Sequence, residues 1–280
     1  MRLSISKSQS DAFDIRYVNP IHRNYFASSI VNGWYNSAFK KIGNLFERAN
    51  KPIITFIDDD TINAESVQRY HDACVNAGIK GGYACITANL DANEGLAELL
   101  KSYEREGFHV TYHCHTQSNF YRLANRDSVA LENDVVTGLQ KMKSYGFVDY
   151  NQWCTPYGVS DEEIQNLAQK WGLDCIVTSG GSSYETTEAK RGRFGLERMS
   201  FEPTDTDGGF NLSDIKNVIL EASQNNGWVL ITTHFSSWTQ DGFARFKELV
   251  DYAKDNGFEV KTLNEAWRIR KPIYEFYEMF

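Results

Sequence analysis

From residue 52 onward the chain alternates short apolar runs with longer amphipathic segments. The apolar runs, which predict strands, span residues 52–57, 82–88, 109–115, 147–153, 174–178, 194–201, 228–235 and 258–262. The segments between them carry apolar residues at helical spacing, as Val67, Tyr70 and Cys74 do within residues 64–78. Strands that alternate with helices in this way pair in parallel through right-handed crossovers.

This alternation predicts the architecture of most of the chain. Further helices are predicted over residues 93–106, 128–145, 160–171, 212–226 and 241–256, with a short one after Leu263. Seven or eight strand–helix units predict a distorted (β/α)7–8 barrel of parallel strands over residues 51–280, with a doubly wound open sheet as the alternative. Residues 1–50 do not follow the alternation, so we expect an N-terminal extension there, with one helix near 35–48.

Composition limits the partners of such a barrel. The 280 residues carry a net charge of −8 and no long Lys/Arg run, so nucleic acid and anionic membranes are poor candidates. Five widely spaced cysteines without a C-x-x-C pair favour a reducing compartment over a disulfide framework or a cysteine-rich zinc site. No apolar run is long enough for a transmembrane helix. The polar start lacks a signal-like apolar core, so we expect a cytoplasmic protein, or one exported or associated with a phage by another route.

Side chains that can bind a metal follow two of the predicted strands. Asp58, Asp59 and Asp60 follow the first strand, and His113 and His115 end the third. Residues just past the carboxyl ends of barrel strands share one mouth. Three adjacent carboxylates repel one another and a cation relieves that repulsion, although a solvated turn or a helix cap is the structural alternative. The two histidines are two positions apart on a strand, so both face one side.

Other candidates lie near the ends of later strands. His234 ends a strongly apolar run in which a histidine has no packing role, so it is a candidate general acid, with strand-end hydrogen bonding as the alternative. Trp153, Tyr157 and Trp238 lie near strand ends and are candidates to stack on a sugar ring, although packing explains each about equally well.

In this order the segments resemble the NodB-homology polysaccharide deacetylases, carbohydrate esterase family 4, over about residues 50–268. The Asp-Asp motif of that family implies Asp58 as the catalytic base and Asp59 as a metal ligand. Its H-[ST]-x-x-H motif reads HTQSN here, which implies His115 and Asn119 as the other two ligands.

Two further motifs extend the resemblance. The R-x-P-Y-G motif reads CTPYG at residues 154–158, which implies that the backbone N–H of Tyr157 helps to form an oxyanion hole. A late Leu-His motif reads Thr233-His234, which implies His234 as the acid. The chain departs from the pattern at two positions. Asn119 stands where a second metal histidine is expected, and Cys154 stands where an arginine pairs with the catalytic aspartate.

The resemblance implies a metal-dependent carbohydrate deacetylase that removes acetyl groups from an N- or O-acetylated poly- or oligosaccharide. Zn²⁺ is the favoured ion, and Co²⁺, Ni²⁺ and Mn²⁺ are alternatives. The two departures keep a non-catalytic glycan-binding member of the same fold open. A third reading is another metal-dependent amidohydrolase or esterase, in which His113 and His115 are joint ligands. The polymer and the oligomeric state stay open.

Overall fold

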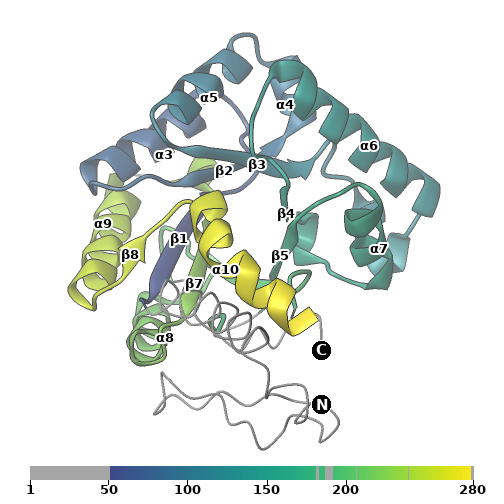
Figure 1. Cartoon of the computed structure of the whole chain (residues 1–280). Helices are drawn as coiled ribbons and strands as arrows, with labels where there is room; N and C mark the ends of the chain where they lie inside the picture. Colours follow the sequence, from purple (N-terminus) through teal and green to yellow (C-terminus); the bar gives the residue numbers. More distant parts are fainter. Residues whose placement is uncertain (1–50, 181–182, 187–191, 206, 239, 279–280) are drawn as a thin grey trace, which may run out of the picture.

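The computed structural model describes residues 51–180, 183–186, 192–205, 207–238 and 240–278, and they form a single barrel (Figure 1). Its parallel strands are β1 (Ile53–Asp58), β2 (Gly82–Ile86), β3 (His109–Cys114), β4 (Gln152–Cys154), β5 (Cys175–Ser179), β6 (Leu196–Ser200), β7 (Trp228–Thr233) and β8 (Glu259–Val260). The helices are α3 (Ala64–Asn76), α4 (Thr87–Ala92), α5 (Leu96–Arg105), α6 (Ser128–Tyr145), α7 (Glu162–Lys170), α8 (Leu212–Gln224), α9 (Gln240–Asp255) and α10 (Leu263–Glu278).

Strand pairing closes the barrel through β1. The hydrogen-bonded order is β2-β3-β4-β5-β6-β7-β1-β8, and β1 also pairs with β2. The start of β1 pairs with β8, at Ile53 and Glu259, whereas its end pairs with β2, at Ile57 and Gly82. Seven strands therefore form a closed ring and β8 is wedged beside the first half of β1. The predicted barrel is confirmed, and the open-sheet alternative is wrong.

Alternate residues of β1 pack on opposite sides of the barrel wall. Ile53 and Ile57 point into the lumen, where they join a buried cluster that includes Trp267 of α10. Ile54 and Phe56 point outward and pack in the larger cluster beneath the helices. Because both sides are buried, the strand is mostly apolar, and Thr55 is its one polar residue before Asp58.

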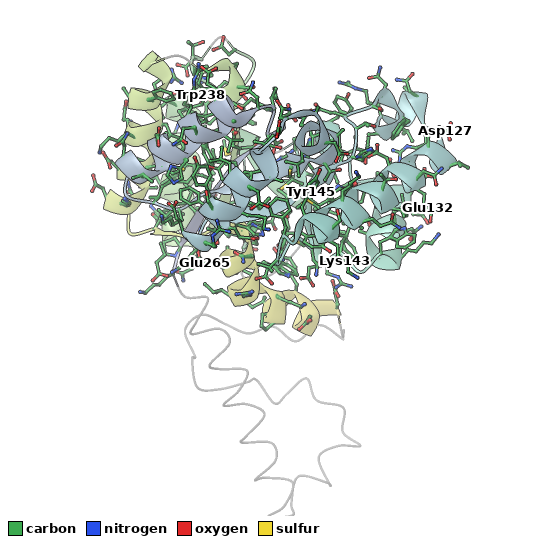
Figure 2. The ribbon with its side chains drawn as sticks, turned by 90° about the horizontal axis from the view of Figure 1, so that it is seen from above. Asp127, Glu132, Lys143, Tyr145, Trp238 and Glu265 are labelled. Atoms are coloured by element: carbon green, nitrogen blue, oxygen red, sulfur yellow. The ribbon has the colours of Figure 1, made fainter. Side chains whose placement is uncertain are left out.

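The last helix fills the amino-terminal opening of the barrel. Figure 1 shows α10 lying across that opening. Its lumen-facing side chains, which are almost fully buried, are Leu263, Ala266, Trp267, Ile273 and Tyr274. In Figure 2, Glu265 near the start of α10 and Trp238 beyond the end of β7 lie at opposite ends of the barrel. Functional groups at the strand carboxyl ends are therefore on the open side.

Three predicted elements differ in the structure. The helix after Leu263 is not short, because it continues to Glu278. Of the fourth predicted strand, residues 147–153, only Gln152 and Trp153 lie in β4, which continues to Cys154, and residues 87–88 of the second begin α4 instead. The helix expected near 35–48 and the rest of the N-terminal extension lie outside the described residues. In the described part of the chain, no helix combines the length and the apolar character needed to cross a bilayer.

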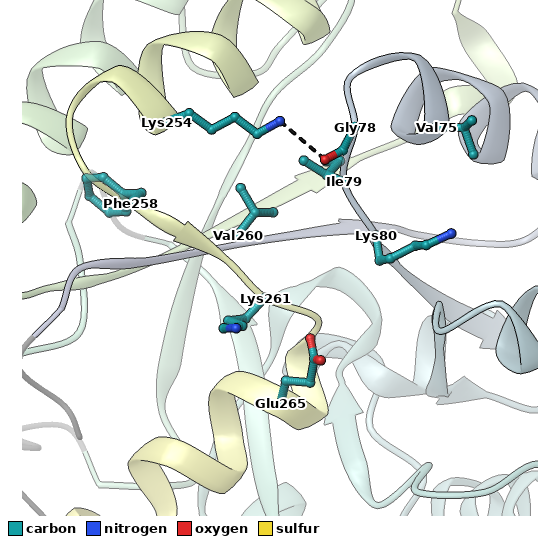
Figure 3. A pocket seen from close by; sticks show the side chains of 9 residues that line it. All are labelled: Val75, Gly78, Ile79, Lys80, Lys254, Phe258, Val260, Lys261 and Glu265. Carbon is teal, nitrogen blue, oxygen red and sulfur yellow. Dashed lines mark hydrogen bonds between the residues drawn. The ribbon is translucent and has the colours of Figure 1, made fainter.

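A hollow of about 460 Å³ opens where β8 and β2 diverge (Figure 3). It is lined by three lysines, Lys80, Lys254 and Lys261. Lys254 is occupied there, since its Nζ donates to the carbonyl oxygens of Ala77 at 2.6 Å and Gly78 at 3.3 Å. This hollow adjoins the amino-terminal ends of the strands, so it is separate from the residues that follow the strands.

Candidate active site

The three aspartates after β1 point in three directions. Asp58 lies on the outward face that Phe56 shares, and it is fully buried under the turn η6 (Phe235–Ser237). Its Oδ1 accepts hydrogen bonds from the Phe235 backbone N–H at 2.7 Å and from Thr233 Oγ1 at 3.2 Å. Burial raises the pKa of Asp58 well above its usual value. The structure thus places Asp58 in the wall of the barrel and not in its mouth.

Asp59 points into the barrel mouth and is held by Arg198 of β6. The two guanidinium nitrogens lie 2.9 Å from Oδ1 and 2.7 Å from Oδ2, which is a bidentate pair. Both side chains are almost fully buried, at 4% and 3% exposure. Arg198 also donates to the Thr155 carbonyl oxygen at 3.3 Å. Asp59 therefore has a fixed orientation and a compensated charge.

Asp60 faces His113 across the mouth. Asp60 and Thr61 both have positive φ, at 76° and 34°, and the Asn89 amide holds this turn by donating to the Asp60 carbonyl oxygen at 3.0 Å. Asp60 Oδ1 lies 3.4 Å from His113 Nε2. Burial alone would raise the pKa of Asp60, but His113 and the more distant His234 and Arg198 outweigh it and lower that pKa.

The facing atoms of Asp60 and His113 fit a divalent cation. Within the described residues neither Asp60 Oδ1 nor His113 Nε2 has a hydrogen-bond partner, although both are buried. His113 Nδ1 donates to the Cys154 carbonyl oxygen at 2.6 Å, which fixes the ring with Nε2 directed at Asp60. Two ligand atoms of one tetrahedral Zn²⁺ lie about 3.3 Å apart, close to the observed 3.4 Å. In the described part of the chain, no three His, Cys, Asp or Glu side chains converge on one such point.

His115 and Asn119 have other surroundings. His115 is half-buried, and its Nδ1 lies 3.0 Å from Thr87 Oγ1 at the start of α4. Asn119 is exposed at the start of the short helix η3 (Asn119–Tyr121). Asp59, the expected third member of this ligand set, is bound to Arg198 instead. The pair that the structure brings face to face is therefore Asp60 with His113.

A buried carboxylate on α6 holds the loop after β3. Asp134 accepts hydrogen bonds from the backbone N–H groups of His115 at 2.8 Å and Thr116 at 2.9 Å. The Tyr121 hydroxyl donates to the same carboxylate at 2.7 Å. This loop is thereby fixed at the barrel mouth by a residue more than one turn inside a helix.

The CTPYG segment forms a tight turn over β5. Tyr157 lies in the short helix η5 (Pro156–Gly158) with φ 55°. Its hydroxyl donates to the Gln117 carbonyl oxygen at 2.9 Å, and the guanidinium of Arg122 covers its ring at 3.9 Å. Gly158, with φ 63°, sits so close to Ser179 that a Cβ would overlap that residue's side chain and backbone nitrogen. The turn therefore needs glycine at this position.

Both tryptophans expected near a sugar are in the core. Trp153 is fully buried on the outward face of β4, and its Nε1 donates to the His113 carbonyl oxygen at 2.8 Å. Trp238 is buried beneath the helices, where it stacks on Phe235 with ring centroids 4.2 Å apart. The expectation that these rings contact a ligand is corrected, because neither presents a free face at the mouth.

His234 lies beside the mouth and is paired with Glu202. Its Nδ1 lies 2.6 Å from Glu202 Oε1, and its side chain is 37% exposed. Burial alone would lower the pKa of His234, but the hydrogen bond to Glu202 and the charges of Asp59, Glu202 and Asp60 raise it to about 9. His234 is therefore protonated at neutral pH and can act as an acid.

A second hollow, of about 390 Å³, opens beside Asp60. It has an apolar side and a polar side. Its lining consists of Asp60, Ile62, Ile86, Ala88, Asn89, Thr116 and Gln117. Asp60 forms part of the wall of this hollow, and 17% of its side chain is exposed.

Comparison with known proteins identifies the fold family of the barrel. No protein-family profile matches the chain, and no curated protein matches it in sequence. A family 4 carbohydrate esterase from Streptomyces lividans, in complex with acetate, superposes with a TM-score of 0.52 at 14% identity, over 75% of this chain and 91% of that chain. This chain has the fold of the family 4 carbohydrate esterases.

Other structures with the family 4 fold agree. The peptidoglycan deacetylase PdaC from Bacillus subtilis has a TM-score of 0.53 at 14% identity, over 82% of this chain and 96% of that chain. A family 4 pseudoenzyme from Bacillus anthracis has a TM-score of 0.54 at 12% identity, over 78% of this chain and 66% of that chain. The resemblance drawn from the motifs is therefore confirmed for the fold.

Sequence reasoning about the family 4 fold missed two residues of this site. Arg198 lies within a predicted strand, and its partner Asp59 is 139 positions away, so no local pattern connects them. Glu202 lies two residues beyond β6, and only its place at a strand end could have marked it. Asp60 was noticed as part of an acidic triplet, but its separate contact with His113 needed the turn geometry.

Proposed function

We propose that the protein is a metal-dependent deacetylase that hydrolyses acetyl groups on a poly- or oligosaccharide. The observation that carries this proposal is the pair of buried atoms Asp60 Oδ1 and His113 Nε2, which face each other 3.4 Å apart at the barrel mouth and have no other partner among the described residues. Asp59 and His234 flank the same mouth. Asp60 and His113 would hold a divalent ion, and Zn²⁺ suits a carboxylate and an imidazole ligand.

The reaction then needs a base, an electrophile and an acid. When bound, a divalent ion supplies Lewis-acid polarisation of the acetyl carbonyl. Asp59 takes the proton of the attacking water, because it points into the mouth whereas Asp58 does not. This assignment moves the base by one residue from the one that the motif implies.

The remaining steps belong to Tyr157 and His234. The backbone N–H of Tyr157, in the strained turn after β4, is the donor that would stabilise the developing oxyanion. His234, which Glu202 keeps protonated, gives its proton to the leaving nitrogen or oxygen of the sugar. The hollow of about 390 Å³ beside Asp60 is large enough to admit an acetylated sugar.

Acetate release tests this proposal. The full chain, loaded with Zn²⁺ or Co²⁺, is incubated with N-acetylated chito-oligosaccharides and with acetylated xylan, and free acetate is measured. We expect release that Asp59→Asn reduces by at least about 100-fold, whereas Asp58→Asn retains far more activity. A larger loss in Asp58→Asn than in Asp59→Asn would restore the motif-based assignment of the base.

A glycan-binding protein without catalysis is the second candidate. Two observations favour it: no third metal ligand of the usual kind joins Asp60 and His113 among the described residues, and one structural neighbour is a pseudoenzyme. A mutant of that neighbour has restored enzymatic activity, so the same fold occurs there with and without activity. Tight binding of the oligosaccharide without acetate release, at saturating Zn²⁺ or Co²⁺, would support this candidate.

A further inference from the structure

We propose that Arg198 of β6 is the positioning residue for Asp59. The positive charge beside Asp59 thus comes from β6, although a side chain at position 154 on β4 is also placed to supply it. This inference rests on the proposed function, in which Asp59 takes the proton of the attacking water. It concerns two residues on strands that are not adjacent, since β5 lies between β4 and β6.

The first support is the geometry of the pair. Nη1 of Arg198 contacts Oδ1 of Asp59 at 2.9 Å and Nη2 contacts Oδ2 at 2.7 Å, so the carboxylate cannot rotate without breaking a contact. Both side chains are nearly inaccessible to solvent. A buried bidentate ion pair holds a carboxylate in one orientation far better than an exposed pair does.

The second support is the space beside Cys154. The Cys154 side chain points into the lumen, in the same cluster as Leu196 of β6. Arg198 lies near this thiol: although burial raises the pKa of Cys154, the charge of Arg198 acts to lower it, and its guanidinium donates to the next carbonyl oxygen, that of Thr155. If Arg198 were removed, the guanidinium of an arginine at position 154 would therefore occupy the place where the guanidinium of Arg198 now lies.

The functional consequence follows from the orientation of Asp59. A base that accepts a proton from water must point one oxygen at the water throughout the reaction, and a displacement of about 1 Å can cost about 100-fold in rate. Arg198 does not need to touch the sugar to have this effect. Its loss should lower kcat and leave KM nearly unchanged.

The test compares four variants with the parent chain. Arg198→Met removes the charge at similar volume, and Arg198→Lys keeps the charge but loses the bidentate contact. We expect Arg198→Met to lower kcat for acetate release from N-acetylated chito-oligosaccharide by at least about 100-fold, and Arg198→Lys to fall in between. Arg198→Ala should resemble Arg198→Met. The double variant Arg198→Ala, Cys154→Arg should have a kcat at least about tenfold higher than that of Arg198→Ala.

Thermal unfolding gives a readout that does not depend on activity. Arg198→Ala should lower the melting temperature by about 10 °C, because it leaves a buried carboxylate unpaired. In the Asp59→Asn background the same substitution should cause little further decrease. The Cys154→Arg substitution should restore the melting temperature of Arg198→Ala only when residue 59 is aspartate.

The results that would contradict the inference about Arg198 differ from those that would contradict the proposed function. Parent-like kcat in Arg198→Met, or an equal fall in melting temperature in both residue-59 backgrounds, would show that Arg198 only fills space. A double variant that has a parent-like circular dichroism spectrum and yet regains neither kcat nor melting temperature would show that an arginine at position 154 on β4 does not replace Arg198 on β6. Absence of acetate release by the parent chain would contradict the proposed function, while the thermal cycle would still decide whether Arg198 is coupled to Asp59.

Discussion

Nδ1 of His234 lies 2.6 Å from Oε1 of Glu202, and the hydroxyl of Ser200 lies 2.7 Å from the same oxygen. The carboxylate therefore receives two hydrogen bonds and fixes the imidazole ring at the edge of the barrel mouth. The strand β6 thus contributes to both sides of the proposed proton transfer, through Arg198 at Asp59 and through the segment that leads to Glu202.

Glu202→Gln should change how activity and stability depend on pH. The folded-state pKa of His234 is raised to about 9, above the value of about 6.5 expected in the unfolded chain. The pair therefore stabilises the fold fully below pH about 6.5, and this contribution is lost as the pH rises through about 9. If the protonated ring is the acid, the alkaline limb of kcat should lie near pH 9 and should move toward pH 6.5 in the variant.

A pH series of acetate release and of melting temperature checks this prediction. Glu221→Gln, a change of an exposed glutamate on α8, is the matched control and should leave the alkaline limb in place. An unchanged limb in Glu202→Gln would mean that His234 is not the acid.

Metal binding should distinguish His113 of β3 from His115, which follows that strand. His113→Ala removes an atom that faces Asp60, so we expect Co²⁺ or Zn²⁺ affinity to fall by at least about 100-fold. His115→Ala and Asn119→Ala should change the affinity far less, because His115 bonds to Thr87 and Asn119 is exposed. Isothermal titration of metal-free protein measures this. Loss of binding in His115→Ala and Asn119→Ala, with retention in His113→Ala, would return the ligand set to the one that the motif implies.

Asp58 should matter for stability through its contact with η6. Asp58→Ala leaves the Phe235 N–H without its acceptor in a buried place, which should cost about 1–3 kcal/mol of unfolding free energy. Asp58→Asn keeps an oxygen in that position and should cost less. Urea unfolding of both variants compares them, and similar costs would mean that the buried negative charge, rather than the acceptor oxygen, is the stabilising feature.

Gly158→Ala should be far more destabilising than Gly172→Ala. Both glycines have positive φ, 63° and 70°, so each substitution pays a conformational cost of about 1–2 kcal/mol. Only at Gly158 does a Cβ collide with a neighbour, Ser179, whereas nothing lies near Gly172. Thermal unfolding should therefore show a clearly lower melting temperature for Gly158→Ala. Similar values would mean that the turn over β5 can relax.

Asp134→Ala should release the loop after β3. The carboxylate accepts bonds from His115, Thr116 and Tyr121, so its removal should cost about 3 kcal/mol and speed amide exchange at the two backbone N–H groups. Glu132→Ala on the same helix is the control, because its ion pair with Lys170 is exposed and should be worth less than about 1 kcal/mol. Hydrogen exchange of the loop measures the difference. Unchanged protection at His115 and Thr116 would show that Asp134 is not the anchor.

The fold was more predictable from the sequence than the site. Parallel strands and helices recur along the chain with clear hydrophobic periodicity, and each depends on residues close in sequence. The direction of each aspartate was not predictable in this way. β1 is apolar on both faces, so its sequence contains no alternation from which to read that Asp58 points outward and Asp59 inward.

Contacts between segments that are distant in the sequence explain why other features of the site could not be predicted. Cys154 marked the loss of an arginine, but the sequence contains no local sign that Arg198 lies beside it. His113 and His115 are two positions apart, so a regular strand would direct both side chains to one side. The bend after β3 instead leaves His113 facing Asp60 and His115 facing Thr87. The tryptophans near strand ends were ambiguous from the start, because a ring at a strand end can face either the helices or the solvent.

The position of α10 has a consequence for how the chain folds during synthesis. Its buried residues complete the inner cluster of the barrel, yet they are among the last of the described residues to leave the ribosome. Until then the inner faces of β1 and β7 lack the cover that α10 gives them at the amino-terminal opening. A nascent chain that ends before α10 therefore exposes apolar surface to chaperones and to other chains, and the barrel can close as a unit only after translation of that helix.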